Sequence, residues 1–153
     1  MTGWRVGYLT GPAPMLKVMA TVQEQVASCV NAGAQRAALA ALSGPQDCVE
    51  TMRQAYQRRR DLIVERLNRI PGVRCPRPDG AFYVFPDVRA ITRDTVTLAE
   101  RLLHEHKVVV SPGEAFGPAS AGFLRMSYAP SEDTINEAID RFEAGLDRAR
   151  SQA

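Results

Sequence analysis

Residues 46–70 read QDCVETMRQAYQRRRDLIVERLNRI, and this stretch decides the fold. Its apolar residues recur three, four or seven positions apart, as they do along one face of a helix. They are Val49, Met52, Tyr56, Ile63, Leu67 and Ile70. Pro71 and Gly72 follow and end the pattern. The sequence therefore predicts one long helix whose other faces are rich in arginine.

Beyond Gly72 the hydrophobic period changes. Short apolar runs predict strands at residues 73–75, 81–85, 107–111 and 122–129, with a helix at 95–106. Ser131 is expected to cap a last helix that carries acidic residues in its first turn. The apolar face of that helix is formed by Ile135, Ala138, Ile139, Phe142 and Leu146. We therefore expect residues 46–153 to form a long helix and a two-layer α+β domain.

Residues 1–45 fit this domain badly. Residues 3–10, GWRVGYLT, have high strand propensity and are apolar on both sides of Arg5, as in a strand buried within a parallel sheet. Two helices are expected next, one from Pro12 onward and one from an Asn31 cap to Leu42, but no parallel neighbour strand follows. A strand without its sheet leaves unpaired backbone groups. We therefore expect the rest of the sheet to lie outside the sequence, which makes the chain a fragment.

The composition excludes several classes of protein. The chain has 153 residues, a formal net charge of +2 and no apolar run that approaches a membrane span. No secretory signal is expected, and three cysteines without a C-x-x-C pair favour reduced thiols in a cytoplasmic protein. His104 and His106 have no partner residues that would complete a metal site. Arginine outnumbers lysine, but interspersed acidic residues argue against a nucleic-acid partner.

Two arginines stand in the middle of apolar strands. Alternation places Arg5 on one face with Gly3 and Gly7, and places Arg125 on one face with Phe123 and Ser127. A guanidinium keeps its proton, so at such a position it needs an anion or hydrogen-bond acceptors. An edge-strand arginine that faces water, or that pairs with a nearby acid, is the alternative. The two arginines are the candidate anion-binding residues.

Other candidates are weaker. Residues 112–117, PGEAFG, form either a loop over a ligand or an ordinary turn. The arginine run 58–60 either contacts phosphates or forms a solvated helix face. Lys17 and Lys107 are the only amine nucleophiles, and they lie in a surface-type helix pattern and at the start of an expected strand, respectively. We expect no catalytic residue among these groups.

Several segments in a fixed order resemble a known family. They are MTGWRVGYLTGP (1–12), QRAALAAL (35–42), YQRRRDLIVERL (56–67), PDGAFYVFPD (78–87), VVVSPGEAFG (108–117) and GFLRMSYA (122–129). Together they resemble pyridoxal-phosphate-dependent aminotransferases of fold type I, in particular the bacterial aspartate aminotransferase-like group of class I. The resemblance covers essentially the whole chain. It implies an α/β fold of which residues 1–45 are the remnant of the large cofactor-binding domain and residues 46–153 the connecting helix and a complete α+β small domain.

The resemblance also implies roles for the two arginines. Arg5 occupies the position of the arginine that contacts the phosphate of pyridoxal 5'-phosphate, and Arg125 the position of the arginine that grips the substrate α-carboxylate. The family's lysine that forms the Schiff base with the cofactor would fall upstream of Met1. The resemblance therefore implies amino group transfer between an amino acid and a 2-oxo acid, a homodimer in the complete enzyme, and an inactive chain when these residues stand alone.

Two interpretations of the chain stay open. The chain is either part of such a catalyst or a non-catalytic α+β module for dimerisation or weak nucleic-acid binding. Within the first interpretation, a lyase, decarboxylase or synthase of the same fold type is an alternative, because one fold hosts several reactions. The sequence does not identify the amino acid substrate.

Overall fold

The structure is a computed structural model, and it describes residues 2–150. The chain divides into two compact units, residues 1–50 and 51–153. In the first unit, a short 3₁₀ helix η1 (Thr2–Trp4) precedes two helices, α1 (Ala13–Ala27) and α2 (Ala32–Ser43). The two helices confirm the sequence prediction. Asn31 caps α2 as expected, because its side chain accepts a hydrogen bond from the Ala34 N–H at 3.0 Å.

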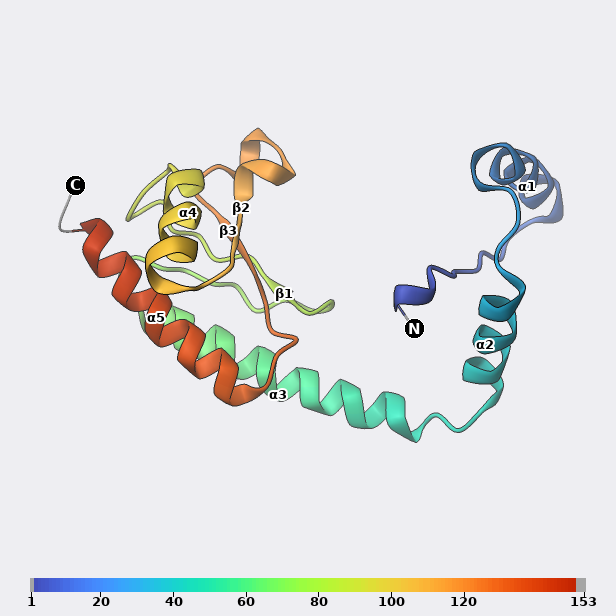
Figure 1. The fold of residues 1–153 in the computed structure, drawn as a ribbon, viewed down its shortest axis with the longest axis horizontal. Helices are drawn as coiled ribbons and strands as arrows, with labels where there is room; N and C mark the ends of the chain where they lie inside the picture. Colours follow the sequence, from blue (N-terminus) through green and yellow to red (C-terminus); the bar gives the residue numbers. More distant parts are fainter. Residues whose placement is uncertain (1, 151–153) are drawn as a thin grey trace. The chain divides into compact units, whose positions relative to one another are not determined.

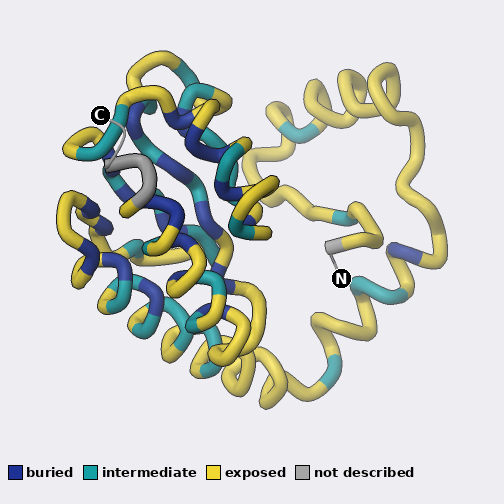
Figure 2. The backbone as a smooth tube through the Cα atoms, turned by 60° about the vertical axis from the view of Figure 1, so that its left-hand side comes forward, coloured by how far each residue is buried: buried dark blue, intermediate teal, exposed yellow. Residues whose placement is uncertain are grey.

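The predicted strand at residues 3–10 is wrong for this structure. Residues 2–4 form η1, Arg5 adopts a positive φ of 49°, and residues 5–12 are irregular. A strand is stabilised by pairing with neighbours, and the described residues provide no strand that pairs with this segment. The first unit also has little core, because Ala34 is its only buried residue between positions 3 and 50 (Figure 2).

The second unit contains the three-stranded sheet. Helix α3 (Asp47–Arg69) leads into it, followed by β1 (Tyr83–Val84), α4 (Thr95–His106), β2 (Ser111–Pro112), two 3₁₀ turns η2 (Gly113–Phe116) and η3 (Pro118–Ser120), β3 (Leu124–Ser127) and α5 (Glu132–Arg150). The strand order is β1-β3-β2, and both pairings are antiparallel. The helix predicted at 95–106 is confirmed at both ends.

Three of the four strands predicted beyond Gly72 are present but shorter than expected, and the fourth is wrong. Residues 73–75 contribute only one bridge, between Arg74 and Asp87, in place of a full strand. The strand predicted at 107–111 begins only at Ser111, because Lys107 closes α4 in the left-handed conformation. Ser111 pairs with Arg125, and Tyr83 pairs with Ser127, so β3 is the central strand.

The core lies between this sheet and helices α3, α4 and α5. One buried cluster joins side chains from all of them, including Leu67, Leu102, Leu124, Phe142 and Leu146. Helix α5 runs along α3 (Figure 1), and the Arg66 guanidinium donates to Asn136 Oδ1 at 2.6 Å across that contact. Ser131 caps α5 as predicted, because its hydroxyl accepts from the Thr134 N–H at 3.3 Å. The expected apolar face of α5 is buried, since Ile135, Ile139, Phe142 and Leu146 all belong to the core.

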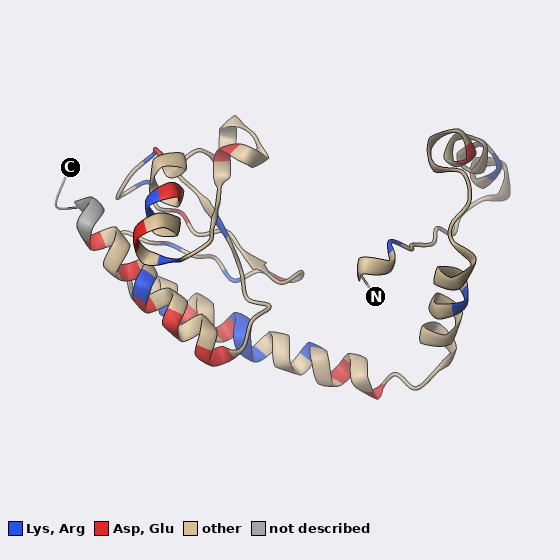
Figure 3. Cartoon of the chain, viewed as in Figure 1, with Lys and Arg blue, Asp and Glu red and all other residues tan. Residues whose placement is uncertain are grey.

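Charges of both signs alternate along the outer faces of α3 and α5 (Figure 3). Within residues 2–150, no helix combines the length and the apolar character that crossing a membrane requires. The same residues hold no group of three or more histidine, cysteine or acidic side chains arranged to bind a metal ion.

Candidate functional site

The sheet of the second unit separates a buried face from a partly open one. Along β3, Leu124 and Met126 are buried in the core, whereas Arg125 between them is half-buried on the opposite face. The alternation predicted from the sequence is thus confirmed for this strand. Arg125 therefore stands on the face of the sheet that the helices leave uncovered.

Two aromatic rings hold the guanidinium of Arg125. Its central carbon lies 4.6 Å from the ring centroid of Tyr83 and 4.7 Å from that of Phe116. Each distance is within the range of a cation–π contact. One guanidinium nitrogen also donates to Ser111 Oγ on the neighbouring strand at 3.3 Å. These contacts fix the plane of the guanidinium without neutralising its charge.

No carboxylate among the described residues lies within ion-pair distance of Arg125. The surroundings are instead apolar: Phe85 packs edge-on against Phe116 at 5.9 Å and stacks on Phe123 at 5.4 Å. A half-buried cation in such surroundings interacts strongly with an anion that reaches it, because water screens the attraction poorly there. The arrangement suits recognition of a carboxylate by two parallel hydrogen bonds.

The loop that carries Phe116 is held by close packing. The Gly113 N–H donates to the Phe123 carbonyl at 2.8 Å, and a Cβ added at Gly113 would lie 2.0 Å from the Ser120 carbonyl oxygen. The buried Thr95 hydroxyl donates to Glu114 Oε2 in the same loop. This hydrogen bond lowers the pKa of the Glu114 carboxyl, because it favours the charged form. Residues 112–117 therefore form an ordered turn that its neighbours hold in place, rather than a mobile loop.

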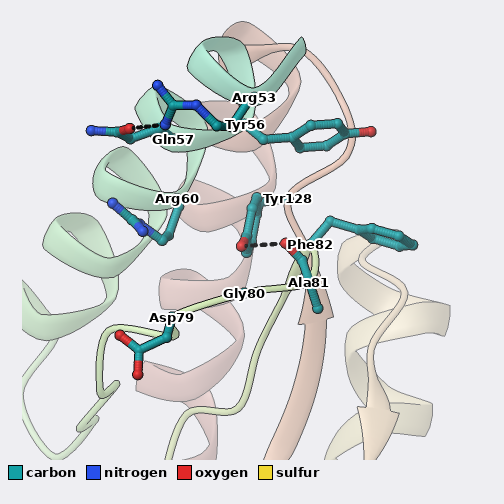
Figure 4. Close-up of a pocket in the computed structure, with 9 residues that line it drawn as sticks. All are labelled: Arg53, Tyr56, Gln57, Arg60, Asp79, Gly80, Ala81, Phe82 and Tyr128. Atoms are coloured by element: carbon teal, nitrogen blue, oxygen red, sulfur yellow. Dashed lines mark hydrogen bonds between the residues drawn. The ribbon is translucent and has the colours of Figure 1, made fainter. Parts of the chain in front are cut away.

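A cleft of about 350 Å³ lies between α3 and the turn before β1. Figure 4 shows the residues that line it: Arg53, Tyr56, Gln57, Arg60, Asp79, Gly80, Ala81, Phe82 and Tyr128. The Tyr128 hydroxyl donates to the Ala81 carbonyl at 2.9 Å and so holds Ala81 at a positive φ of 63°. Burial raises the pKa of Tyr128, so the hydroxyl stays protonated and keeps donating.

Arg5, the other predicted anion-binding residue, belongs to the first unit and is exposed. A Cβ added at Gly3 or at Gly7 would meet no atom within 4 Å, so space is open on both sides of it. The glycine face expected from strand alternation is absent, because residues 2–4 form η1 and residues 5–12 are irregular.

The other sequence candidates are either exposed or engaged in contacts within the chain. Lys17 is exposed on α1, and Lys107 Nζ donates to the His104 carbonyl at 2.8 Å. In the arginine run, Arg58 lies 3.6 Å from Glu132, Arg59 donates to the Ala129 carbonyl at 2.7 Å, and Arg60 pairs with Asp61 at 2.9 Å. The contacts of Arg58 and Arg59 tie α3 to the segment before α5 and to its first turn, and together with the Arg60–Asp61 pair they favour a structural over a phosphate-binding role for the run.

Sequence reasoning missed the two rings beside Arg125. The only sequence signal was the aromatic content of the segments 81–85 and 112–117, which does not say that both meet the same guanidinium. The cleft of Figure 4 was missed for the same reason, since its aromatic side chains come from α3, the turn before β1 and the end of β3.

Comparison with known proteins places the chain in a family. The family model described as aminotransferase class I and II matches residues 1–142. The chain belongs to this family. This confirms the resemblance to the family seen in the sequence, and it confirms the α/β fold class.

Individual aminotransferases of the family are closely similar to this chain. An aspartate aminotransferase of Rhizobium meliloti is 45% identical over 97% of this chain, and an aspartate/prephenate aminotransferase of Cereibacter sphaeroides is 46% identical over 94% of it. The solved structure of an aromatic aminotransferase from Pyrococcus horikoshii matches 97% of this chain with a TM-score of 0.88 at 39% identity, and 40% of its own chain is covered. The chain spans 38% of the length of the two curated relatives.

Proposed function

We propose that this chain is the C-terminal part of a pyridoxal-phosphate-dependent aminotransferase, in which Arg125 binds the α-carboxylate of the amino acid or 2-oxo acid substrate. One observation carries the proposal: the guanidinium of Arg125 is held between Tyr83 and Phe116 and has no carboxylate partner among the described residues. A substrate carboxylate supplies the missing anion. The α/β family fold and the names of the relatives support the reaction class.

The described residues fit part of a pyridoxal phosphate site. Arg5, with open space at Gly3 and Gly7, suits the cofactor's phosphate. Neither lysine suits the cofactor's aldehyde, because Lys17 is exposed on α1 and Lys107 is engaged at the end of α4. We therefore propose that the lysine lies in a preceding segment and that these 153 residues alone do not transfer amino groups. When bound, pyridoxal phosphate supplies the electron sink for the reaction.

The chain's own residues contribute binding and orientation. Arg125 fixes the carboxylate in the plane of its guanidinium, and the two rings restrict that plane to one orientation. The half-buried aromatic surroundings exclude water from the ion pair and so strengthen it. Holding the substrate in one geometry is itself a large part of catalysis.

The wider assembly follows from the same proposal. Residues 1–45 are proposed to complete a large cofactor-binding domain, which would cover the apolar side chains of α1 that now stay exposed, such as Val22 and Val26. Residues 46–153 are proposed as the connecting helix and small domain of a cytoplasmic homodimer. The relatives' names make aspartate the first amino acid to test.

The test is amino transfer by the polypeptide that the gene encodes when it is read upstream of Met1 in the same frame. Arg125→Lys keeps the charge but loses the paired hydrogen bonds, so kcat/KM for transfer from aspartate to a 2-oxo acid is expected to fall about 100-fold or more. Arg141→Lys, at a surface arginine paired with Glu137, is the matched control. An equal effect of both substitutions contradicts the role of Arg125.

A separate measurement tests the expected inactivity of the 153 residues. The chain is mixed with pyridoxal phosphate and treated with borohydride. We expect no stoichiometric lysine adduct. A stable adduct at Lys17 or Lys107, located by mass spectrometry, overturns the proposal that the reactive lysine lies elsewhere.

A further inference from the structure

Another cleft, separate from that of Figure 4, lies in the unit of residues 51–153 and has three arginines in its lining. It has a volume of about 480 Å³, within the usual range for small-molecule sites, and its lining includes Arg74, Arg89, Arg93 and one acid, Asp87. Arg125 and the residues around it are not part of it. The cleft is therefore distinct from the proposed carboxylate site.

The frame of this cleft is rigid. Arg74 and Asp87 exchange two backbone hydrogen bonds, of 3.0 and 2.8 Å, which join the segment after α3 to the segment after β1. The Val88 N–H donates to the Gly122 carbonyl at 2.9 Å and anchors the other side. Gly122 has a φ of 85°, and a Cβ there would lie 2.2 Å from Cγ of Arg89. Only a glycine at this position lets the Arg89 stem pack as it does.

Arg89 and Asp87 neutralise each other. The Arg89 guanidinium donates from Nε to Asp87 Oδ1 at 2.9 Å and from Nη2 to Oδ2 at 2.6 Å, and it also stacks over the Phe123 ring at 4.9 Å. Its hydrogen bonds hold the pKa of the Asp87 carboxyl below its ordinary value, with a smaller contribution from the charge of Arg74. Asp87, the one acid in the lining of the cleft, is therefore already paired with Arg89.

Arg74 and Arg93 keep most of their positive charge, although Arg74 also interacts with Asp87 through space. Neither forms an ion pair with a carboxylate of the described residues. Asp94, the acid next to Arg93 in sequence, instead caps α4 by accepting from the Thr97 N–H at 3.0 Å. This differs from Arg69 and Arg141, which lie on helices and pair with glutamates four residues away. Two unpaired guanidiniums at a rigid cleft form a concentrated positive charge.

We propose that this cleft binds a small phosphate ligand with two phosphoryl groups, one for each of Arg74 and Arg93. Guanidinium groups match phosphate oxygens in pairs of hydrogen bonds, and each phosphoryl group brings at least one negative charge to one of the two cations. The Arg89–Asp87 pair forms the wall of the cleft rather than a ligand contact. The site would be a regulatory or second ligand site, since it lies outside the carboxylate site.

The test titrates the chain with inorganic pyrophosphate at low ionic strength and follows backbone amide signals of residues 72–74 and 87–93 by NMR. We expect saturable shifts at these residues, and an apparent affinity at least tenfold weaker in the double variant Arg74→Gln/Arg93→Gln. The double variant Arg69→Gln/Arg141→Gln loses the same charge from paired positions, so we expect its affinity to change less than threefold.

Two further arms make the result decisive. Arg5→Gln is expected to leave these shifts unchanged, which separates this cleft from the proposed cofactor-phosphate residue. The absence of saturable shifts, or an equal loss in both double variants, overturns the proposal. Tighter binding of a short single-stranded oligonucleotide than of pyrophosphate, with a steep dependence on salt, also overturns it in favour of a nucleic-acid surface.

Discussion

Gly113→Ala is expected to destabilise the second unit and to disturb Arg125 from a distance. The new methyl group would lie 2.0 Å from the Ser120 carbonyl oxygen and 2.7 Å from that of Phe123, so the turn has to move. Overpacking of this kind costs about 1–3 kcal/mol. Displacement also breaks the Gly113–Phe123 hydrogen bond, which adds about 1 kcal/mol. The loss of glycine's freedom in the unfolded chain offsets about 0.5 kcal/mol, which leaves a net loss of about 1.5–3.5 kcal/mol.

The assay is urea unfolding of the chain, followed by circular dichroism. The matched control is Gly80→Ala, because a Cβ at Gly80 meets no atom within 4 Å. We expect the control to stay within about 0.5 kcal/mol of the parent chain. For a unit of this size, the loss in Gly113→Ala corresponds to a Tm lower by about 6–28 °C. If the two variants differ by less than about 0.5 kcal/mol, the packing argument for the loop is refuted.

Two further predictions concern titratable groups of the second unit. Burial raises the pKa of Cys75 to about 11 from 9.0, whereas Cys29 and Cys48 are exposed. At about pH 8 we therefore expect iodoacetamide to modify Cys75 at least ~100-fold more slowly than the two exposed cysteines. Comparable rates at all three cysteines, measured by peptide mass spectrometry, would contradict this. Because the pKa of Glu114 is lowered from 4.5, its hydrogen bond from Thr95 stabilises the fold above that pH and is lost as the pH falls through the lowered value. Thr95→Val is therefore expected to reduce the urea midpoint at about pH 7 and to reduce it less at about pH 3, and a pH-independent difference would point to packing alone.

The helices were predictable because their signals are local. Asn31 and Ser131 accept hydrogen bonds from the N–H groups three residues on, as capping residues do, and the helix at 95–106 matches its apolar period at both ends. The buried face of α5 follows from the same spacing. Such features depend on residues within one or two turns of the chain.

The strand at residues 3–10 and the surroundings of Arg125 were not predictable in this way. Strand propensity around Arg5 describes a segment that needs partners, and the described residues contain none for it. Tyr83 and Phe116 meet Arg125 only because β1 and β2 pair with β3 in one register and because η2 turns back at Gly113. Strand register and turn geometry depend on contacts between segments that are distant in the sequence, so the composition of each segment does not predict them.

Among the residues that the structure describes, aromatic rings rather than a carboxylate surround Arg125. A carboxylate placed beside it would hold the guanidinium equally well, but it would compete with any substrate carboxylate for the same hydrogen bonds. The rings of Tyr83 and Phe116 orient the cation by attraction to their faces, at about 0.5–2 kcal/mol each, and occupy none of the donor positions along its edge. Arg89 shows the contrast within the same unit, because Asp87 takes two of its donors and leaves it a structural residue. Replacing Tyr83 or Phe116 by an acid should therefore stabilise Arg125 and abolish its affinity for carboxylates.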